Sequence, residues 1–376
     1  MSIICVCYLY VPLVSSLISP AVSNWMYLGL IGVPPPLQQQ QAEPGIEIED
    51  PALAQANIVC GALTTLSSEQ IEVCMKHPNI IYAVANGAHK GIQECQYQFR
   101  NERWNCTTND DDEDVFGYIL KTGSKETAFI YAVTSAGVVH AVTQGCSAGE
   151  LAECSCDGTN HGRSTPEGWK WGGCSDNIEY GLEFARKFVD APEQLKSFEK
   201  NEKLKNRIHM NLHNNEAGRQ IVQSLMRMHC RCHGVSGSCE LKTCWKTIPP
   251  FNEIGDIIKK KYNDAVLFRN TRNAVKLRSK RNKARTKKEI PKDNLIHVSK
   301  SPNFCRYNPK KGILGTKDRE CSKLSKGNDS CSILCCGRGY DTQVVKIREK
   351  CRCKFVWCCY VKCRTCEKEQ YKYYCK

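Results

Sequence analysis

Several kinds of residue are absent or scarce over long stretches of this 376-residue chain. There is no lysine or arginine before Lys76, no cysteine between Cys244 and Cys305, and no long apolar run beyond the N-terminus, and the nine histidines are scattered. The missing apolar runs exclude a protein that crosses the membrane several times, because each span needs about 20 apolar residues. The scattered histidines, with no repeated Cys/His quartet, argue against a zinc-finger protein.

The lack of basic residues at the N-terminus concentrates positive charge in the rest of the chain. Six acidic residues precede Lys76, whereas the formal net charge of the whole chain is +14. The remainder therefore carries about +20, which favours polyanionic partners such as sulfated glycans. Nucleic acid would be the equivalent partner in the cytosol, but the cysteine content argues against that compartment.

The 26 cysteines are the most informative feature of the composition. Cys5 and Cys7 lie in the apolar N-terminus; of the other 24, twelve fall between Cys60 and Cys244 and twelve between Cys305 and Cys375. So high a content is typical of extracellular disulfides. Two even and separate sets predict two independently bridged halves.

The N-terminus is apolar and uncharged. Residues 1–19 are followed by the small residues Ala21 and Ser23, which predicts a cleaved signal peptide over residues 1–23. An uncleaved signal anchor is the alternative, because apolar residues continue to Val33. Residues 34–57 are rich in Pro, Gln and acids, a composition that buries no core, so residues 24–59 are interpreted as a low-complexity insert.

Residues 60–268 are predicted to form a mostly helical domain. Apolar residues recur at helical spacing in two segments, and Ser124 is a suitable N-cap for the first. The stripes are Phe129, Val133, Ala136 and His140 in residues 125–143, and Ala217, Ile221, Leu225 and Met228 in residues 214–230. We expect the two stripes to pack against each other rather than to bind a ligand, with His140 as a core histidine.

A basic linker over residues 269–300 separates this domain from a cystine-rich C-terminal domain over residues 301–376. Between Arg269 and Lys292 it holds eleven Lys/Arg and a single acid, Glu289. It is either a solvated linker or a contact for heparan sulfate. The "RSKR" at residues 278–281 resembles a dibasic processing site.

Two hairpin ends are predicted from the spacing of the cysteines. Cys230 with Cys244, and Cys232 with Cys239, nest around the short loop "HGVSGS". Two bridges of about 2–4 kcal/mol each exceed what a small hairpin needs for stability, so their role is to hold the loop rigid. Gly234 and Gly237 leave the Ser236 hydroxyl accessible to a modifying enzyme.

Ser236 also has to be considered as a catalytic nucleophile. The run Gly-Val-Ser-Gly-Ser lacks the last glycine of the hydrolase elbow. His233 is adjacent, but so short a loop offers no sheet to hold an acidic partner. We therefore expect no catalytic residue here.

The second hairpin lies near the C-terminus. Paired residues of an antiparallel hairpin have a constant sum of residue numbers, which favours the pairs Cys351–Cys366, Cys353–Cys363 and, at the tip, Cys358–Cys359. Large apolar residues surround that tip, namely Phe355, Val356, Trp357, Tyr360 and Val361. An apolar tip indicates a contact surface; the alternative is that the hairpin is buried against another domain.

The motifs of the chain resemble those of the Wnt family of secreted, lipid-modified signalling glycoproteins. The similarity extends from about Cys60 to Cys375 and is nearest to the Wnt-sixteen subgroup. It rests on "CRCHGVSGSC" (230–239), "GIQECQYQFRNERWNC" (91–106), "KETAFIYAV" (125–133), "CSCD" (154–157), "WGGCSD" (171–176), "NNEAGR" (214–219), "CCGRGYDT" (335–342) and "CKFVWCCYVKC" (353–363).

The resemblance implies an α+β, disulfide-rich fold, with a helical N-terminal domain that carries one hairpin finger and a small cystine-rich β-hairpin domain that carries another. It implies a palmitoleoyl chain on Ser236 and no other cofactor, metal or catalytic activity. The two fingers would grip the cysteine-rich domain of a Frizzled receptor, the second through Phe355, Val356, Trp357, Cys358, Cys359, Tyr360 and Val361.

Further expectations follow from the same resemblance. The implied partners are an LDL-receptor-related co-receptor, the Porcupine acyltransferase, the Wntless carrier and heparan sulfate, for a protein secreted to the extracellular space and matrix. Asn105 and Asn328 begin glycosylation sequons. The remaining implied disulfides are Cys60–Cys74, Cys95–Cys106, Cys146–Cys154, Cys156–Cys174, Cys305–Cys336, Cys321–Cys331 and Cys335–Cys375.

Two other functions remain as alternatives at this point. One is a disulfide-rich matrix protein that binds glycans through residues 269–292. The other is a secreted hydrolase built on Ser236.

Overall fold

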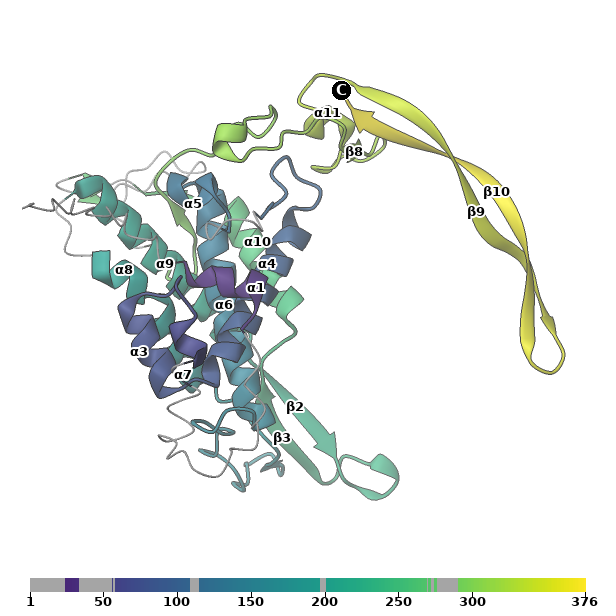
Figure 1. The fold of residues 1–376 in the computed structure, drawn as a ribbon. Coiled ribbons are helices and arrows are strands. Elements are labelled where there is room, and N and C mark those ends of the chain that lie inside the picture. Colours follow the sequence, from purple (N-terminus) through teal and green to yellow (C-terminus); the bar gives the residue numbers. More distant parts are fainter. Residues whose placement is uncertain are drawn as a thin grey trace, which may run out of the picture.

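The computed structural model describes residues 24–33, 56, 58–108, 115–196, 201–268, 270–271, 274–275 and 290–376. The expected signal peptide, most of the expected insert, and the basic run with its processing site lie outside the described residues. The described chain forms a helical part and a cystine-rich C-terminal part, and a β-hairpin projects from each (Figure 1). This arrangement confirms the predicted fold class.

The helical part is arranged around one central helix, α6 (Lys125–Ala148), which is buried over most of its length. The other helices are η1 (Trp25–Tyr27), α1 (Leu28–Ile31), α3 (Ser68–Lys76), α4 (Ile80–Phe99), α5 (Tyr118–Thr122), α7 (Ile178–Val189), α8 (Ala191–Leu195), α9 (Glu202–Ser224) and α10 (Phe251–Asn263). Within the described ranges, no helix combines the length and the apolar character that crossing a membrane requires.

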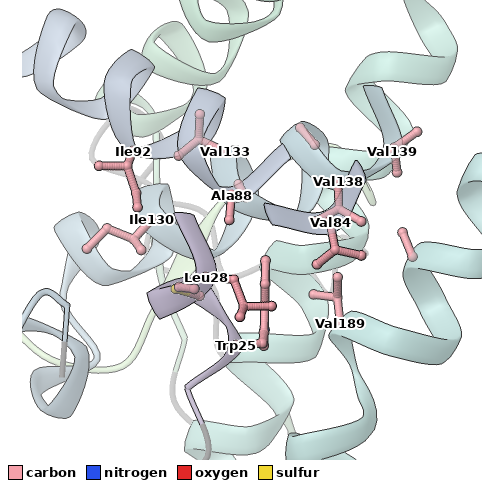
Figure 2. Packing of buried hydrophobic residues seen from close by; sticks show 14 of the residues in the cluster. Trp25, Leu28, Val84, Ala88, Ile92, Ile130, Val133, Val138, Val139 and Val189 are labelled. Carbon is pink, nitrogen blue, oxygen red and sulfur yellow. The ribbon is translucent and has the colours of Figure 1, made fainter. Parts of the chain in front are cut away.

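Small residues let α4 and α9 approach α6 closely. A Cβ added at Gly137 of α6 would lie 2.2 Å from the Gly87 carbonyl oxygen of α4. A Cβ added at Gly218 of α9 would lie 2.0 Å from the Ala132 carbonyl oxygen of α6. Figure 2 shows apolar side chains of α4, among them Val84 and Ala88, beside those of α6 and the N-terminal Trp25 and Leu28.

The predicted helix over residues 125–143 is confirmed and continues to Ala148, with Ser124 at its N-cap. His140 is buried, and one ring nitrogen lies 3.1 Å from the Pro249 carbonyl oxygen, as expected of a core histidine.

The predicted helix over residues 214–230 is wrong at its C-terminal end. Helix α9 stops at Ser224, and Met228 lies half-exposed in a strand. The reason is tertiary, because the segment pairs with a later strand and is bridged to it through Cys230.

Among the described residues, the strands form two three-stranded sheets. The first has the order β1 (Lys170–Trp171), β3 (Lys242–Thr247), β2 (Arg227–Cys232), and the second the order β8 (Glu320–Cys321), β10 (Tyr360–Cys375), β9 (Tyr340–Val356). Two small pairs are β4 (Val266–Leu267) with β7 (Ile296–His297), and β5 (Asn270–Thr271) with β6 (Ala274–Val275). The short elements η3 (Val235–Gly237), η4 (Pro309–Lys311) and α11 (Cys331–Leu334) complete the described fold.

The C-terminal part has a small core of its own, formed by Leu334 and the cystines around it. Leu295, Phe304 and Ile313 pack instead with the helical core. None of the disulfides among the described residues joins the two cysteine sets, in agreement with two independently bridged halves.

Candidate functional site

The β2–β3 hairpin ends in a loop that is held from both sides. Cys230 faces Cys244 in the strand register and is bridged to it, and Cys232 is bridged to Cys239. Inside the bridges the Gly234 amide donates a hydrogen bond to the Ser238 carbonyl oxygen, at 2.8 Å. The two pairs are those that the nesting of the cysteines predicts, and they form a rigid loop.

Ser236 lies at the end of this loop with an exposed side chain. Its backbone is left-handed, with φ 57° and ψ 24°, a conformation that costs roughly 1–2 kcal/mol for a residue with a Cβ. Gly237 is left-handed as well, with φ 78°, whereas Gly234 has an ordinary φ of −68°. Its role is steric, because a Cβ there would lie 2.0 Å from the Ser238 Oγ.

The neighbouring histidine does not form a catalytic pair with Ser236. His233 Nε2 lies 2.7 Å from Thr243 Oγ1, back along the hairpin. Within the described part of the chain, the Ser236 hydroxyl has no hydrogen-bond partner and no carboxylate contacts His233. The hairpin does belong to a sheet, contrary to expectation, since β1 pairs with β3. The arrangement presents a free hydroxyl for modification and has no means of activating it as a nucleophile.

The β9–β10 hairpin is a long two-stranded ribbon interrupted by a bulge. Lys362 faces Lys354, whereas Arg364 faces Cys351, so Arg352 and Cys353 together oppose Cys363. Arg352 takes the left-handed conformation that a bulge allows, with φ 46°.

Because of the bulge, the sum of the numbers of paired residues is not constant along the hairpin, contrary to the expectation from the sequence. Cys353 and Cys363 lie across from each other, but Cys351 and Cys366 are diagonal neighbours two positions apart. Because side chains alternate between the faces of a strand, the two bridges lie on opposite faces of the ribbon. Just below its tip, the ribbon is therefore cross-linked by one disulfide on each face.

The tip of the ribbon is apolar and open to solvent. Val356 pairs with Tyr360 to close the hairpin, and Phe355 pairs with Val361 one step below. Trp357 stands in the turn with 88 % of its surface exposed, and Phe355 is 73 % exposed. The alternative that this hairpin is buried against another domain is wrong for the described residues.

Cys358 and Cys359 lie side by side at the tip of the ribbon, and their sulfur atoms are 2.7 Å apart. The structure assigns no bond between them, and the bridge that the resemblance implies stays a prediction.

The other bridges of the structure match the pairs that the resemblance implies. They are Cys60–Cys74, Cys95–Cys106, Cys146–Cys154, Cys156–Cys174, Cys305–Cys336, Cys321–Cys331 and Cys335–Cys375. Of the two sequon asparagines, Asn328 is exposed and Asn105 is half-buried beside the Cys95–Cys106 bridge.

Both tips project from the body toward the same side of the molecule (Figure 1). One presents an unbonded hydroxyl and the other presents apolar rings.

A model of the Wnt family matches residues 62–376. The chain belongs to the Wnt family. It is 47 % identical to protein Wnt-16 of Bos taurus over 366 residues, which cover 95 % of this chain and 93 % of that protein. It is 46 % identical to Wnt-16 of Mus musculus over 379 residues, with 98 % and 97 % covered.

A solved Wnt structure shares the fold. The structure of human WLS in complex with WNT8A matches with a TM-score of 0.55 and 36 % sequence identity, over 79 % of this chain and 94 % of that chain. The chain is therefore a disulfide-rich signalling ligand similar to Wnt-16, and it is not an enzyme. Wnt family proteins are secreted lipoproteins.

Proposed function

We propose that this Wnt-family ligand binds the cysteine-rich domain of a Frizzled receptor through both hairpin tips, and so activates Wnt signalling in development and cell-fate control. The first contact is a palmitoleoyl chain on Ser236, and the second is the apolar tip from Phe355 to Val361. The observation that carries the proposal is the Ser236 hydroxyl, exposed and unbonded at the end of a doubly bridged loop.

The energetics of the first tip require a lipid. Apart from Val235, the loop is made of small polar or glycine residues, which cannot bury much apolar surface. A palmitoleoyl chain would contribute about 10 kcal/mol gross, at about 0.8 kcal/mol per buried CH₂. Association costs of several kcal/mol reduce that figure but leave a net gain. The rigid loop adds to affinity because little conformational entropy is lost when the lipid docks.

The second tip needs no modification. Phe355, Trp357 and Tyr360 are all more than half exposed on a ribbon with no core behind them. Aromatic side chains of this kind are the residues that most often dominate a protein interface.

The remaining partners are proposed from the family. Porcupine would acylate Ser236, and the complex of WLS with WNT8A supports a Wntless carrier for this chain. We also propose an LDL-receptor-related co-receptor, heparan sulfate binding by residues 269–292, glycans on Asn105 and Asn328, and secretion to the extracellular matrix. The proposed segments remain 1–23, 24–59, 60–268, 269–300 and 301–376. Within the second segment Trp25, Leu28 and Val59 are buried in the helical core, so these residues belong to the helical part and not to an insert.

Peptide mapping of the secreted protein by mass spectrometry tests the proposal. The peptide that contains residues 232–239 should carry the mass of one palmitoleoyl group, and fragmentation should place it on Ser236 rather than Ser238. A bare Ser236 in protein that still activates the receptor at ordinary doses would overturn the proposal. Labelling of Ser236 by a serine-hydrolase reagent would favour the hydrolase, and glycan binding without receptor binding would favour the matrix protein.

A further inference from the structure

The two tips belong to parts of the molecule with separate cores, and Phe304 and Ile313 of the C-terminal part pack in the helical core. The core of the C-terminal part, around Leu334, is separate from the helical core. At the seam Trp104 contacts Phe304, at 6.2 Å between ring centroids, and Lys311 Nζ lies 5.1 Å from the centroid of the Tyr118 ring. Beside the contact of Trp104 with Phe304 lies a cavity of about 590 Å³ whose lining includes Glu102, Arg103, Asn328 and Ile333, from both parts. Apolar packing between the two parts therefore involves Phe304 and Ile313, whereas the small core around Leu334, at the base of the ribbon, takes no part in it.

Hydrogen bonds also join the helical part to the C-terminal part. The Arg319 guanidinium donates hydrogen bonds to the carbonyl oxygens of Glu102 at 2.6 Å, Arg103 at 3.0 Å and Arg100 at 3.1 Å. In the part of the chain that the structure describes, Arg319 forms no ion pair with a carboxylate. Its charge is directed at carbonyl groups just beyond the C-terminal end of α4, where a helix favours a cation.

A reciprocal contact runs in the other direction. Arg103 of the helical part donates from Nε and Nη2 to the Ile333 carbonyl oxygen, at 3.1 and 2.9 Å. Asn328 Nδ2 lies 3.3 Å from Glu102 Oε1, and Lys259 also pairs with that carboxylate. We call the contacts of Arg319 and Arg103 the seam clamp.

Both ends of the clamp are fixed within their own parts. Residues 100–103 lie in the loop closed by the Cys95–Cys106 bridge. Arg319 directly precedes β8, which pairs with β10 at Tyr373 and Tyr374, at the base of the ribbon. The Cys375 amide also donates to the Arg319 carbonyl oxygen, at 3.0 Å. The clamp thus joins the end of α4 to the root of the ribbon.

The ribbon amplifies any movement at its root. Its strand β10 has 16 residues, so at about 3.3 Å per residue the tip lies about 50 Å from the clamp, and a rotation of about 10° there would move the tip by about 9 Å. A receptor domain that touches both tips needs a defined distance between them.

We propose that Arg319 is a positioning residue that sets the span between the two tips and so allows one receptor domain to engage both. This inference rests on the proposed function. It requires no contact between Arg319 and the receptor, and it assigns Arg103 the same role from the opposite side of the seam.

The first test measures the span directly. Nitroxide labels are placed on non-canonical amino acids at Glu240, in the first tip loop, and at Thr365, on the ribbon, and their separation is measured by double electron–electron resonance. Wild type should give a narrow distribution and Arg319→Ala a broad one. Arg348→Ala is the matched control, because it removes a guanidinium from an exposed ion pair within the ribbon and leaves the seam intact. An equally narrow distribution for Arg319→Ala would overturn the inference.

The second test asks whether the span matters for binding. Arg319→Ala should lower the affinity for a Frizzled cysteine-rich domain by about tenfold, because the second contact is no longer preorganised. Arg319→Lys keeps the charge but has a single donor centre, so it should give an intermediate loss. If Arg319→Ala is not secreted, Arg103→Ala undergoes the same measurements.

A double change separates positioning from general damage. In a Trp357→Ala background the second tip contributes less to receptor binding. Arg319→Ala should therefore lower the receptor affinity clearly less in that background than it does in wild type. An equal cost in both backgrounds, or a broad span with unchanged affinity, would overturn the inference. The proposed function fails separately, if Ser236→Ala binds the receptor as tightly as wild type while the span results stand.

Discussion

The two hairpins reach the same side of the molecule by opposite designs. The first has strands of six residues, lies close to the helical core, and ends in a polar loop, the proposed attachment point of the lipid. The second has strands of 17 and 16 residues, stands away from any large core, and ends in exposed aromatic rings. If an enzyme adds the apolar group, as proposed for the first tip, the loop has to be rigid and accessible to that enzyme. The second tip has its own apolar side chains, so it requires a long hairpin whose base is held in a fixed position.

The largest effect should come from removing the attachment point of the lipid. Ser236→Ala should fold, keep its bridges and lose receptor affinity by about a hundredfold or more, because the net contribution of the acyl chain disappears. Binding to a Frizzled cysteine-rich domain measured by biolayer interferometry checks this. Ser238→Ala, two residues away in the same loop, is the control and should bind as wild type. Affinity within about threefold of wild type for Ser236→Ala would show that the first tip binds without its lipid.

The second tip should give a smaller loss. Trp357→Ala removes a ring that is 88 % exposed, so stability should not change. The receptor affinity should fall by roughly thirtyfold, as for an aromatic hot spot of about 2 kcal/mol. Leu324→Ala is the control, since Leu324 is 91 % exposed in the C-terminal part but away from the tip. Unchanged binding of Trp357→Ala would mean that the ribbon tip is not part of the interface.

Removing the Cys353–Cys363 bridge, the one nearer the tip of the ribbon, should increase the mobility of the tip alone. The double change Cys353→Ser with Cys363→Ser removes about 2–4 kcal/mol of constraint from a ribbon that has little core behind it. Hydrogen exchange of the amides of residues 354–362 should accelerate, while helix α6 stays protected. The corresponding double change at Cys60 and Cys74, in the helical part, should leave the ribbon unaffected. Exchange of the tip that does not change would show that the bulge and the register alone hold it.

The smallest effect should come from adding a side chain at Gly234, whose backbone lies close to Ser238 in the first loop. Gly234→Ala puts a Cβ 2.0 Å from Ser238 Oγ and 2.5 Å from the Ser238 carbonyl oxygen, so the loop has to shift and Ser236 moves with it. The acylated fraction of secreted protein should fall severalfold, as measured by intact mass. Gly158→Ala is the control, because a Cβ there meets nothing within 4 Å. An unchanged acylated fraction would mean that the acyltransferase tolerates a displaced loop.

The nested bridges of the two hairpins and the tip residues were predictable because the information is local. Cys232 and Cys239 are seven positions apart, and Phe355 to Val361 surround a single turn, so short-range spacing determines which residues lie at each end. The end of α9 was not predictable in this way. Leu225 and Met228 continue a helical stripe in the sequence, but pairing with β3 draws Met228 into a strand.

The local backbone conformation of the two hairpins could not be predicted from the sequence either. The bulge at Arg352 shifts the register by one residue and sends the two ribbon bridges to opposite faces. Ser236 takes a left-handed backbone, which its own preference disfavours, within the loop that the Cys232–Cys239 bridge closes.

The amino-acid sequence by itself thus determined the nested bridges of the two hairpins, the exposed hydroxyl at one tip and the aromatic rings at the other, because each depends on residues close together in the chain. Only the tertiary structure decided where α9 ends, which face each ribbon bridge occupies and how the ribbon is rooted through Arg319. These features depend on contacts between residues as far apart as Arg100 and Arg319, whose meeting no local pattern encodes.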